Sequence, residues 1–132
     1  GTRIFFSEST TNGVRSQLYE PSTGTETLVS FTTLADKCIW STTSSFLYCA
    51  VPSTIPSASY PDHWYQGKVS FSDTIWRVDS ASGTTNFVID LSSVVEEGID
   101  AINLALDPTE EYLVFTNKKD STLWGLRILG DN

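Results

Sequence analysis

A single histidine limits the acid–base and nucleophilic chemistry open to this chain of 132 residues. A Ser-His-Asp or Cys-His site would have to use His63, with Asp62 or Asp73 as the orienting carboxylate and a nearby serine as the nucleophile. No G-x-S-x-G nucleophile elbow is present. Ser and Thr occupy 35 positions, so serines near a histidine are expected by chance. We therefore favour a loop histidine packed among aromatic rings over a catalytic one.

Aspartates recur along the chain, and a glycosidase would need two of them about 5–9 Å apart across a sugar site. The recurring positions are Asp62, Asp73, Asp79, Asp90, Asp100, Asp107 and Asp120. No D-x-D-x-D-G calcium loop is present. We expect most of these residues to cap turns and to carry solubilising charge. We expect no cofactor and no metal site, because the two thiols lack a C-x-x-C spacing and the histidine is far from them.

Cys38 and Cys49 lie in two apolar segments joined by a short polar stretch. A two-residue turn at Thr43 and Ser44 would place them directly opposite each other on neighbouring strands. Cross-strand side chains stand about 4.5–5.5 Å apart, within reach of a disulfide. Two buried free thiols are the alternative. We expect the disulfide, because an even cysteine count fits an oxidising compartment.

Aromatic residues gather in a long stretch rich in Pro and Ser, residues 53–73. Long connections on rigid scaffolds often bind ligands, and Tyr and Trp supply contact area with little loss of entropy. The alternative is that the rings fold back over the sheet, because a loop of this size needs a small core of its own. We favour this covering role and keep the binding role open. The candidate binding loop comprises Tyr60, Asp62, His63, Trp64 and Tyr65.

Runs of β-branched and aromatic residues bounded by turn formers predict an all-β chain. We expect only one short helical turn, at residues 92–98. The predicted strands are residues 3–7, 17–20, 26–31, 37–41, 46–51, 74–79, 86–91, 102–106, 112–117 and 123–129.

Two hairpin types recur in alternation, which is typical of a repeat architecture. The first type reads LYEPSTGTETLV at residues 18–29 and IWRVDSASGTTNFVI at residues 75–89. It combines an aromatic residue, a carboxylate, a Ser-rich turn that ends in Gly, and a strand. The second type reads CIWSTTSSFLYCAVP at residues 38–52 and INLALDPTEEYLVFTN at residues 102–117. The stretch 53–73 is therefore an insertion into the middle unit.

These hairpins resemble the TolB-type, WD40-like β-propeller repeats. Residues 107–113 (DPTEEYL) are similar to that family's S-P-D-G-x-x-L hairpin, and Asp79 with Gly83 is similar to its φ-D-x-x-T-G turn. Five motifs in order, KCIWS, FLYCAVP, YPDHWYQG, SFSDTIW and FTNKKDSTLW, resemble the C-terminal blades of uncharacterised propeller-like proteins from uncultured bacterial lineages. Asp107 stands where Ser is usual, and residues 125–127 lack the Asp and the TG turn. The resemblance implies four-stranded antiparallel blades, the last of them incomplete.

On this interpretation residues 1–132 form one propeller-type module of about two and a half blades. Residues 1–35 are a partial blade, 36–92 a full blade with the insertion 53–73, and 93–132 a partial terminal blade. Closed propellers usually have at least about four blades, and an end blade without a neighbour exposes an apolar face. We therefore expect either the C-terminal part of a larger propeller or a self-associating unit.

Eight basic against sixteen acidic residues give a net charge of −8, which opposes a nucleic acid backbone. No polybasic patch or long apolar stretch favours a membrane. The start at Gly1 without Met predicts that a preceding segment was removed. We expect a non-catalytic binding, adhesion or assembly module, extracellular or in the cell envelope, whose partner is a protein, a glycan or copies of itself. The alternative is part of a propeller-fold hydrolase that acts on glycans or peptides in the complete funnel.

Overall fold

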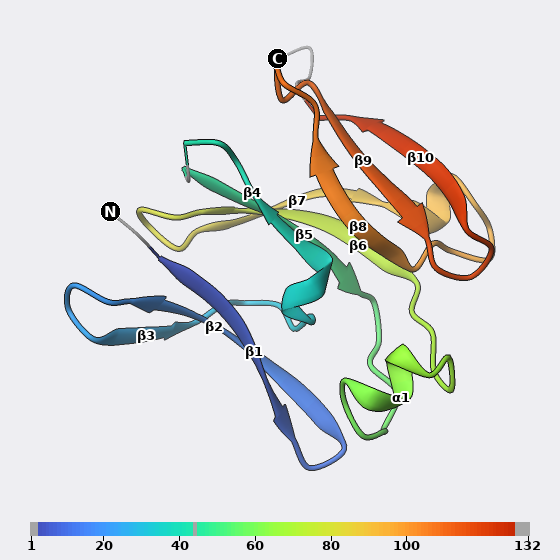
Figure 1. Cartoon of the computed structure of the whole chain (residues 1–132), viewed down its shortest axis with the longest axis horizontal. Coiled ribbons are helices and arrows are strands. Elements are labelled where there is room, and N and C mark those ends of the chain that lie inside the picture. The colour runs from blue at the N-terminus through green and yellow to red at the C-terminus, as the bar shows by residue number, and fades with distance from the viewer. Residues whose placement is uncertain (1–2, 44, 129–132) are drawn as a thin grey trace.

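The computed structural model describes residues 3–43 and 45–128 and contains three antiparallel sheets in this part of the chain (Figure 1). In each sheet every strand lies beside its neighbour in sequence. The N-terminal sheet holds β1 (Ile4–Thr10), β2 (Gly13–Glu20) and β3 (Thr25–Leu28). The middle sheet holds β4 (Cys38–Trp40), β5 (Phe46–Pro52), β6 (Asp73–Asp79) and β7 (Thr85–Asp90). The C-terminal sheet holds β8 (Ala101–Leu106), β9 (Tyr112–Asn117) and β10 (Thr122–Arg127).

The predicted all-β class is confirmed, and each predicted strand overlaps an observed one. In the described residues three short helical turns lie between strands, where one was expected: η1 (Ala35–Lys37), α1 (Asp62–Tyr65) inside the insertion, and η2 (Leu91–Ser93), which overlaps the expected turn at residues 92–98. Lys37, predicted to begin a strand, instead ends η1, and Leu129 lies outside the described residues. No described helix is long and apolar enough to cross a membrane. The described sheets do not close into a ring, and their assignment to propeller blades stays a prediction.

The repeated hairpin has the same turn in both of its copies. Gly24 donates its N–H to the Glu20 carbonyl at 2.8 Å, and Gly83 donates to the Asp79 carbonyl at 2.7 Å. Both glycines have positive φ, 70° and 76°, where a side chain would be strained. The sequence repeat therefore corresponds to a repeat in backbone geometry.

The middle sheet packs against a neighbouring sheet on each face. Side chains alternate between the two faces along β5, and six of its seven residues are buried. Tyr48 and Ala50 pack with Leu113 and Phe115 of the C-terminal sheet. Leu47, on the opposite face, packs in the cluster formed with the N-terminal sheet. Burial on both faces explains why this strand reads as a nearly continuous apolar run.

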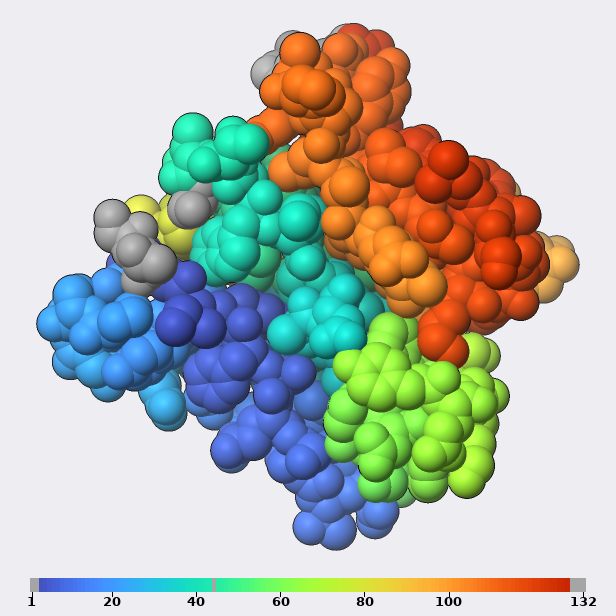
Figure 2. Space-filling model, in the orientation of Figure 1, coloured from blue at the N-terminus to red at the C-terminus, as the bar shows by residue number. Residues whose placement is uncertain are grey.

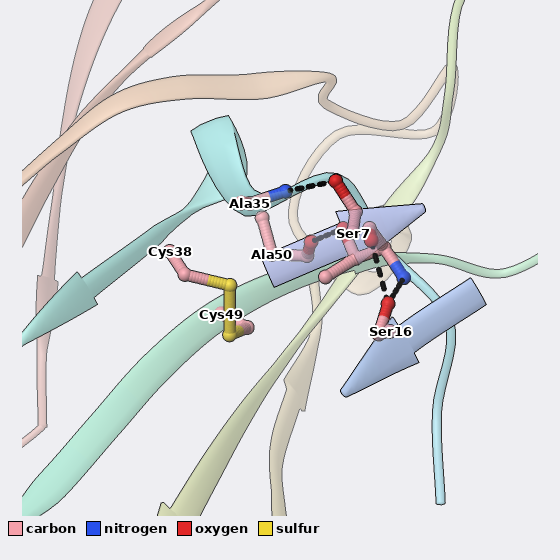
Figure 3. The surroundings of a disulfide bond; sticks show 7 residues. Ser7, Ser16, Ala35, Cys38, Cys49 and Ala50 are labelled. Atoms are coloured by element: carbon pink, nitrogen blue, oxygen red, sulfur yellow. Dashed lines mark hydrogen bonds between the residues drawn. A yellow bond between two sulfur atoms is a disulfide. The ribbon is translucent and has the colours of Figure 1, made fainter. Parts of the chain in front are cut away.

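The segment that links the N-terminal and middle sheets is hydrogen-bonded to both of them (Figure 3). Ser16 Oγ donates to the Thr33 carbonyl at 2.6 Å and accepts from the Thr33 N–H at 2.8 Å. Thr33 Oγ1 donates to the Ala50 carbonyl at 2.6 Å, and the Ala35 N–H donates to Ser7 Oγ at 3.2 Å. The start of η1 is therefore fixed relative to both sheets.

The predicted disulfide is confirmed. Cys38 and Cys49 are register partners on β4 and β5, with a Cα–Cα distance of 4.1 Å, and their sulfur atoms are bonded (Figure 3). Ser44, half of the predicted turn between these strands, lies outside the described residues.

The insertion between β5 and β6 bridges the neighbouring sheets at one end of the molecule. The Ala58 N–H donates to the Asn12 carbonyl in the β1–β2 turn at 3.3 Å. Lys118, which follows β9, donates from Nζ to the Trp64 carbonyl at 2.8 Å. In the space-filling view the insertion, in green, lies against both the blue N-terminal sheet and the orange-red C-terminal sheet (Figure 2).

A close backbone approach joins the start of β6 to the segment before β8. The Asp73 N–H donates to the Ile99 carbonyl at 2.9 Å. Gly98 has a φ of +79°, and a Cβ added there would lie 2.3 Å from Ser72 Oγ and 2.7 Å from Ser72 Cβ. Only glycine fits this crossing without displacement of the neighbouring chain.

We predict that Gly98→Ala lowers the free energy of unfolding by about 2–4 kcal/mol, because it adds a steric clash to the strain of a positive φ. Gly83→Ala has the same strain with nothing within 4 Å, so about 1–2 kcal/mol is expected. Urea unfolding of both variants measures which of the two losses is larger. Equal losses would contradict the close approach at Gly98.

Candidate functional site

The structure divides the residues of the predicted binding loop into buried and exposed ones. Trp64 and Tyr60 are 2% and 5% exposed and pack in the insertion's own core with Leu34, Ala58 and Phe71. Tyr65 is 54% exposed, and Asp62 is also exposed. The binding role of this loop stays a prediction, and its accessible aromatic ring is Tyr65.

His63 is half-buried and forms a hydrogen bond within its own loop. Its Nδ1 accepts a hydrogen bond from the Ser59 N–H at 3.1 Å. Among residues 3–43 and 45–128, no hydrogen bond joins His63 to Asp62 or Asp73. The histidine–carboxylate contact of a Ser-His-Asp site is therefore not formed in the described structure.

Apart from the exposed Asp62, the recurring aspartates fall into two groups. In the first group the side chain accepts hydrogen bonds from the backbone of a following turn, as predicted: Asp79, Asp90, Asp107 and Asp120. Asp73 and Asp100 are instead completely buried. These two residues are the exceptions to the prediction that most of the aspartates cap turns or carry solubilising charge.

The two buried carboxylates share one buried ammonium, that of Lys37, and we call these three side chains the Lys37 cluster. Lys37 Nζ lies 2.6 Å from Asp100 Oδ1 and 2.8 Å from Asp73 Oδ2, and all three side chains are 0% exposed. The third donor position of Nζ is used at 2.7 Å by the Ala101 carbonyl. The cluster thus joins η1 to the starts of β6 and β8.

The insertion is attached to the same cluster. Asp100 Oδ2 accepts from Trp64 Nε1 at 2.9 Å and from the Phe71 N–H at 3.0 Å. Lys37 Nζ lies 5.2 Å from the centre of the Trp64 ring and 5.4 Å from that of Phe71. A cation near aromatic faces is stabilised by their quadrupoles. The buried charge thereby fixes the two rings that hold α1 in place.

Asp73 combines a salt bridge with incomplete hydrogen bonding. Its Oδ2 accepts from Lys37 and from the Ala101 N–H at 2.7 Å, whereas Oδ1 has no partner. Burial disfavours the carboxylate and raises the pKa of Asp73 from 3.8 to about 6, although Lys37 acts in the opposite direction. Asp100 adds a smaller upward effect. Protonation of Asp73 near pH 6 leaves one ammonium facing one carboxylate.

Two pockets open at the surface on either side of Tyr65. The first, about 210 Å³, lies against the N-terminal sheet and is lined by Ser7, Ser9, Val14, Leu34, Asp36, Tyr60, Pro61 and Tyr65. The second, about 180 Å³, lies against the C-terminal sheet and is lined by Asp36, Trp64, Tyr65, Ile102, Asn103 and Lys118. The Tyr65 hydroxyl donates to Asp36 Oδ2, which raises the pKa of the phenol. We call the first of these pockets the N-side pocket and the second the C-side pocket.

Within the described ranges, no three His, Cys, Asp or Glu side chains lie close enough together to hold a metal ion. In comparisons with known proteins, no family model, no curated protein and no solved structure matches the chain. The likeness to TolB-type repeats therefore depends on the sequence motifs alone.

Sequence reasoning missed Lys37 because a lysine before an apolar strand is ordinarily exposed. One signal was available. Asp73 begins a strand that contains several apolar residues, and Asp100 and Lys37 each directly precede such a strand. These three charged residues can be recognised as one cluster only when the packing of the sheets against each other is known.

We predict that Lys37→Met lowers the free energy of unfolding by about 3–5 kcal/mol, because it leaves two buried carboxylates without a cation. The exposed Lys68→Met is the matched control and is expected to change stability by less than about 0.5 kcal/mol. Urea unfolding measures both. A loss below about 1 kcal/mol for Lys37→Met would contradict the shared-ammonium geometry.

We predict that Asp73 stabilises the chain increasingly as pH falls from 7.5 to 4.5. Its folded pKa of about 6 exceeds the ordinary 3.8, so the folded state binds the proton more tightly. The resulting gain in the free energy of unfolding is at most about 3 kcal/mol, and it is lost as pH rises through 6.

Urea unfolding at successive pH values should show this gain in the native chain relative to Asp73→Asn, which cannot ionise. The native chain's stability minus that of the variant should rise towards acid pH. A difference that is constant or falls over this range would contradict a raised pKa. Other carboxylates with lowered pKa values lose stabilising interactions in more acidic solution and so set the lower end of the usable pH range: Glu20, Asp107, Glu110 and Asp120.

Proposed function

We propose that this chain is a non-catalytic binding or assembly module of the β-propeller type. Its three sheets pack face to face in chain order, and the middle one is covered on both faces. The two flanking sheets each have one covered and one open face. A stack of sheets with open ends supports a unit that is completed by further sheets, from a larger propeller or from copies of itself.

The open face of the N-terminal sheet carries apolar side chains. Phe5 points into the core, so Ile4 and Phe6 point to the opposite side. The strand register places Tyr19 beside Ile4, and Leu28 beside Gln17, which itself pairs with Phe6. Leu28 is 63% exposed. This open face is the one that a neighbouring sheet would cover.

The open face of the C-terminal sheet has the same character. Leu113 and Phe115 point into the core, so Tyr112 and Val114 point outward. Leu123 pairs with the outward Thr116 and is 73% exposed. Apolar residues on both terminal faces are the observation that carries the proposal.

The buried carboxylate pair of the Lys37 cluster does not support the hydrolase alternative. A glycosidase needs two carboxylates that reach the substrate, whereas the Asp73 and Asp100 side chains are 0% exposed and paired with Lys37. We place the module in the extracellular space or cell envelope, because the Cys38–Cys49 disulfide fits an oxidising compartment. Its partners in this proposal are a protein, a glycan or further copies, and the charge of −8 argues against nucleic acid.

We predict that the chain self-associates through its open faces. Sedimentation velocity should give a mass above the 14.6 kDa of one chain that increases with concentration. Leu28→Lys and Leu123→Lys, one on each face, should shift the population to monomer because they add charge to apolar surfaces. Val94→Lys, at an exposed apolar residue outside both faces, is the control. A native chain that stays a 14.6 kDa monomer at high concentration would contradict the proposal.

A further inference from the structure

Tyr65 is the large exposed ring of the insertion and stands between two pockets. Both the N-side and the C-side pocket include Tyr65 and Asp36 in their lining. A ligand that occupies both pockets must therefore cross the Tyr65 ring. Each pocket is smaller than the about 300 Å³ at which sites for drug-sized ligands begin, so each suits one ring-sized unit.

The Tyr65 ring is held in position before any ligand arrives. Its hydroxyl donates to Asp36 Oδ2, and its ring packs against Trp64 with 5.4 Å between the ring centres. Trp64 is itself held by its hydrogen bond to the buried Asp100. A ring fixed in this way loses little entropy on binding.

The two pockets combine apolar walls with groups that donate hydrogen bonds and groups that accept them. Val14 and Leu34 line the N-side pocket, and Ile102 and Trp64 the C-side pocket. The polar groups are hydroxyl, carboxylate, carboxamide and ammonium: Ser7, Ser9, Asp36, Asn103 and Lys118. Such a set can both donate hydrogen bonds to a polyhydroxylated ligand and accept them from it.

The C-side rim has a specific backbone feature. Asn103 has a φ of 55°, and the β8–β9 register shifts between Ile102 and Ala105. This bulge presents an exposed carboxamide at the pocket edge. On the same side, Lys118 Nζ lies 5.3 Å from the centre of the Trp64 ring. Bulges commonly redirect a side chain toward a binding site.

Charge selects among ligands that carry many hydroxyls. The pockets contain one carboxylate, Asp36, and one ammonium, Lys118, whose charges balance. The chain as a whole carries −8 and repels anions at a distance. An uncharged ligand fits this field better than an acidic or sulfated one.

We propose that the two pockets bind a neutral saccharide of at least two sugar units across the Tyr65 ring. The apolar face of one sugar ring packs on Tyr65, as aromatic surfaces favour. Asp36 and Asn103 form hydrogen bonds with its hydroxyl groups. This inference deepens the proposed function and rests on the binding role proposed there.

The test is titration of the ¹⁵N-labelled full chain with neutral di- to tetrasaccharides of glucose, galactose, mannose and N-acetylglucosamine, in α and β linkage. At least one should give saturable amide shifts at Ser9, Asp36, Tyr65 and Asn103. Tyr65→Ala should weaken binding about tenfold or more, as truncation of a central aromatic contact does. Tyr65→Phe, which keeps the ring, should retain most of the affinity.

Phe87→Ala removes an exposed aromatic ring outside both pockets and outside both open faces, and should leave the affinity unchanged. Thermal melts establish that each variant is folded. The inference is overturned if no neutral saccharide shifts the pocket amides, if digalacturonate binds equally well, or if Tyr65→Ala binds as the native chain does. Sedimentation of the same samples separates the two proposals. Association without saccharide binding overturns this inference alone, and saccharide binding without association overturns only the assembly proposal.

Discussion

The buried ammonium of Lys37 is the interaction on which the arrangement of this chain depends. One cation placed between two buried carboxylates is favourable only where all three groups meet within hydrogen-bonding distance, because each loses its hydration. Those groups come from η1 and from the starts of β6 and β8, and the insertion is attached to them through Asp100. An apolar core permits small shifts in packing, whereas an unpaired buried charge does not. The cluster thus sets how the middle and C-terminal sheets and the insertion lie relative to one another.

The binding surface follows from this constraint. Asp100 holds the Trp64 indole, and Trp64 supports the exposed ring of Tyr65. Because the insertion also contacts the β1–β2 turn through Asn12 and the segment after β9 through Lys118, a pocket opens on each side of that ring. The open faces of the outer sheets lie on the sides turned away from the middle sheet. Ligand binding and assembly can therefore use different parts of the molecule.

The strands and the disulfide could be predicted because their signals are local. Alternating apolar runs and Gly-containing turns indicate strands, and a short connection set the register that pairs Cys38 with Cys49. The Lys37 cluster could not be predicted, because Lys37 and Asp100 are 63 residues apart and meet only after three sheets have packed. Nor could Tyr65 be separated from the buried Trp64, since α1 spans only four residues and shows no helical periodicity. In irregular segments, tertiary packing decides which side chains are buried.

Native-state hydrogen exchange tests most directly whether the three sheets form one cooperative unit around the cluster. Leu18, Ile75 and Leu113 report on the N-terminal, middle and C-terminal sheets, and each lies on a strand with neighbours on both sides. If the shared ammonium and the segments tied to it unite the sheets, the three amides should exchange through the same global opening, with equal free energies. Exchange of one sheet at a clearly lower free energy than the other two would show that the sheets open independently, and would contradict this central claim.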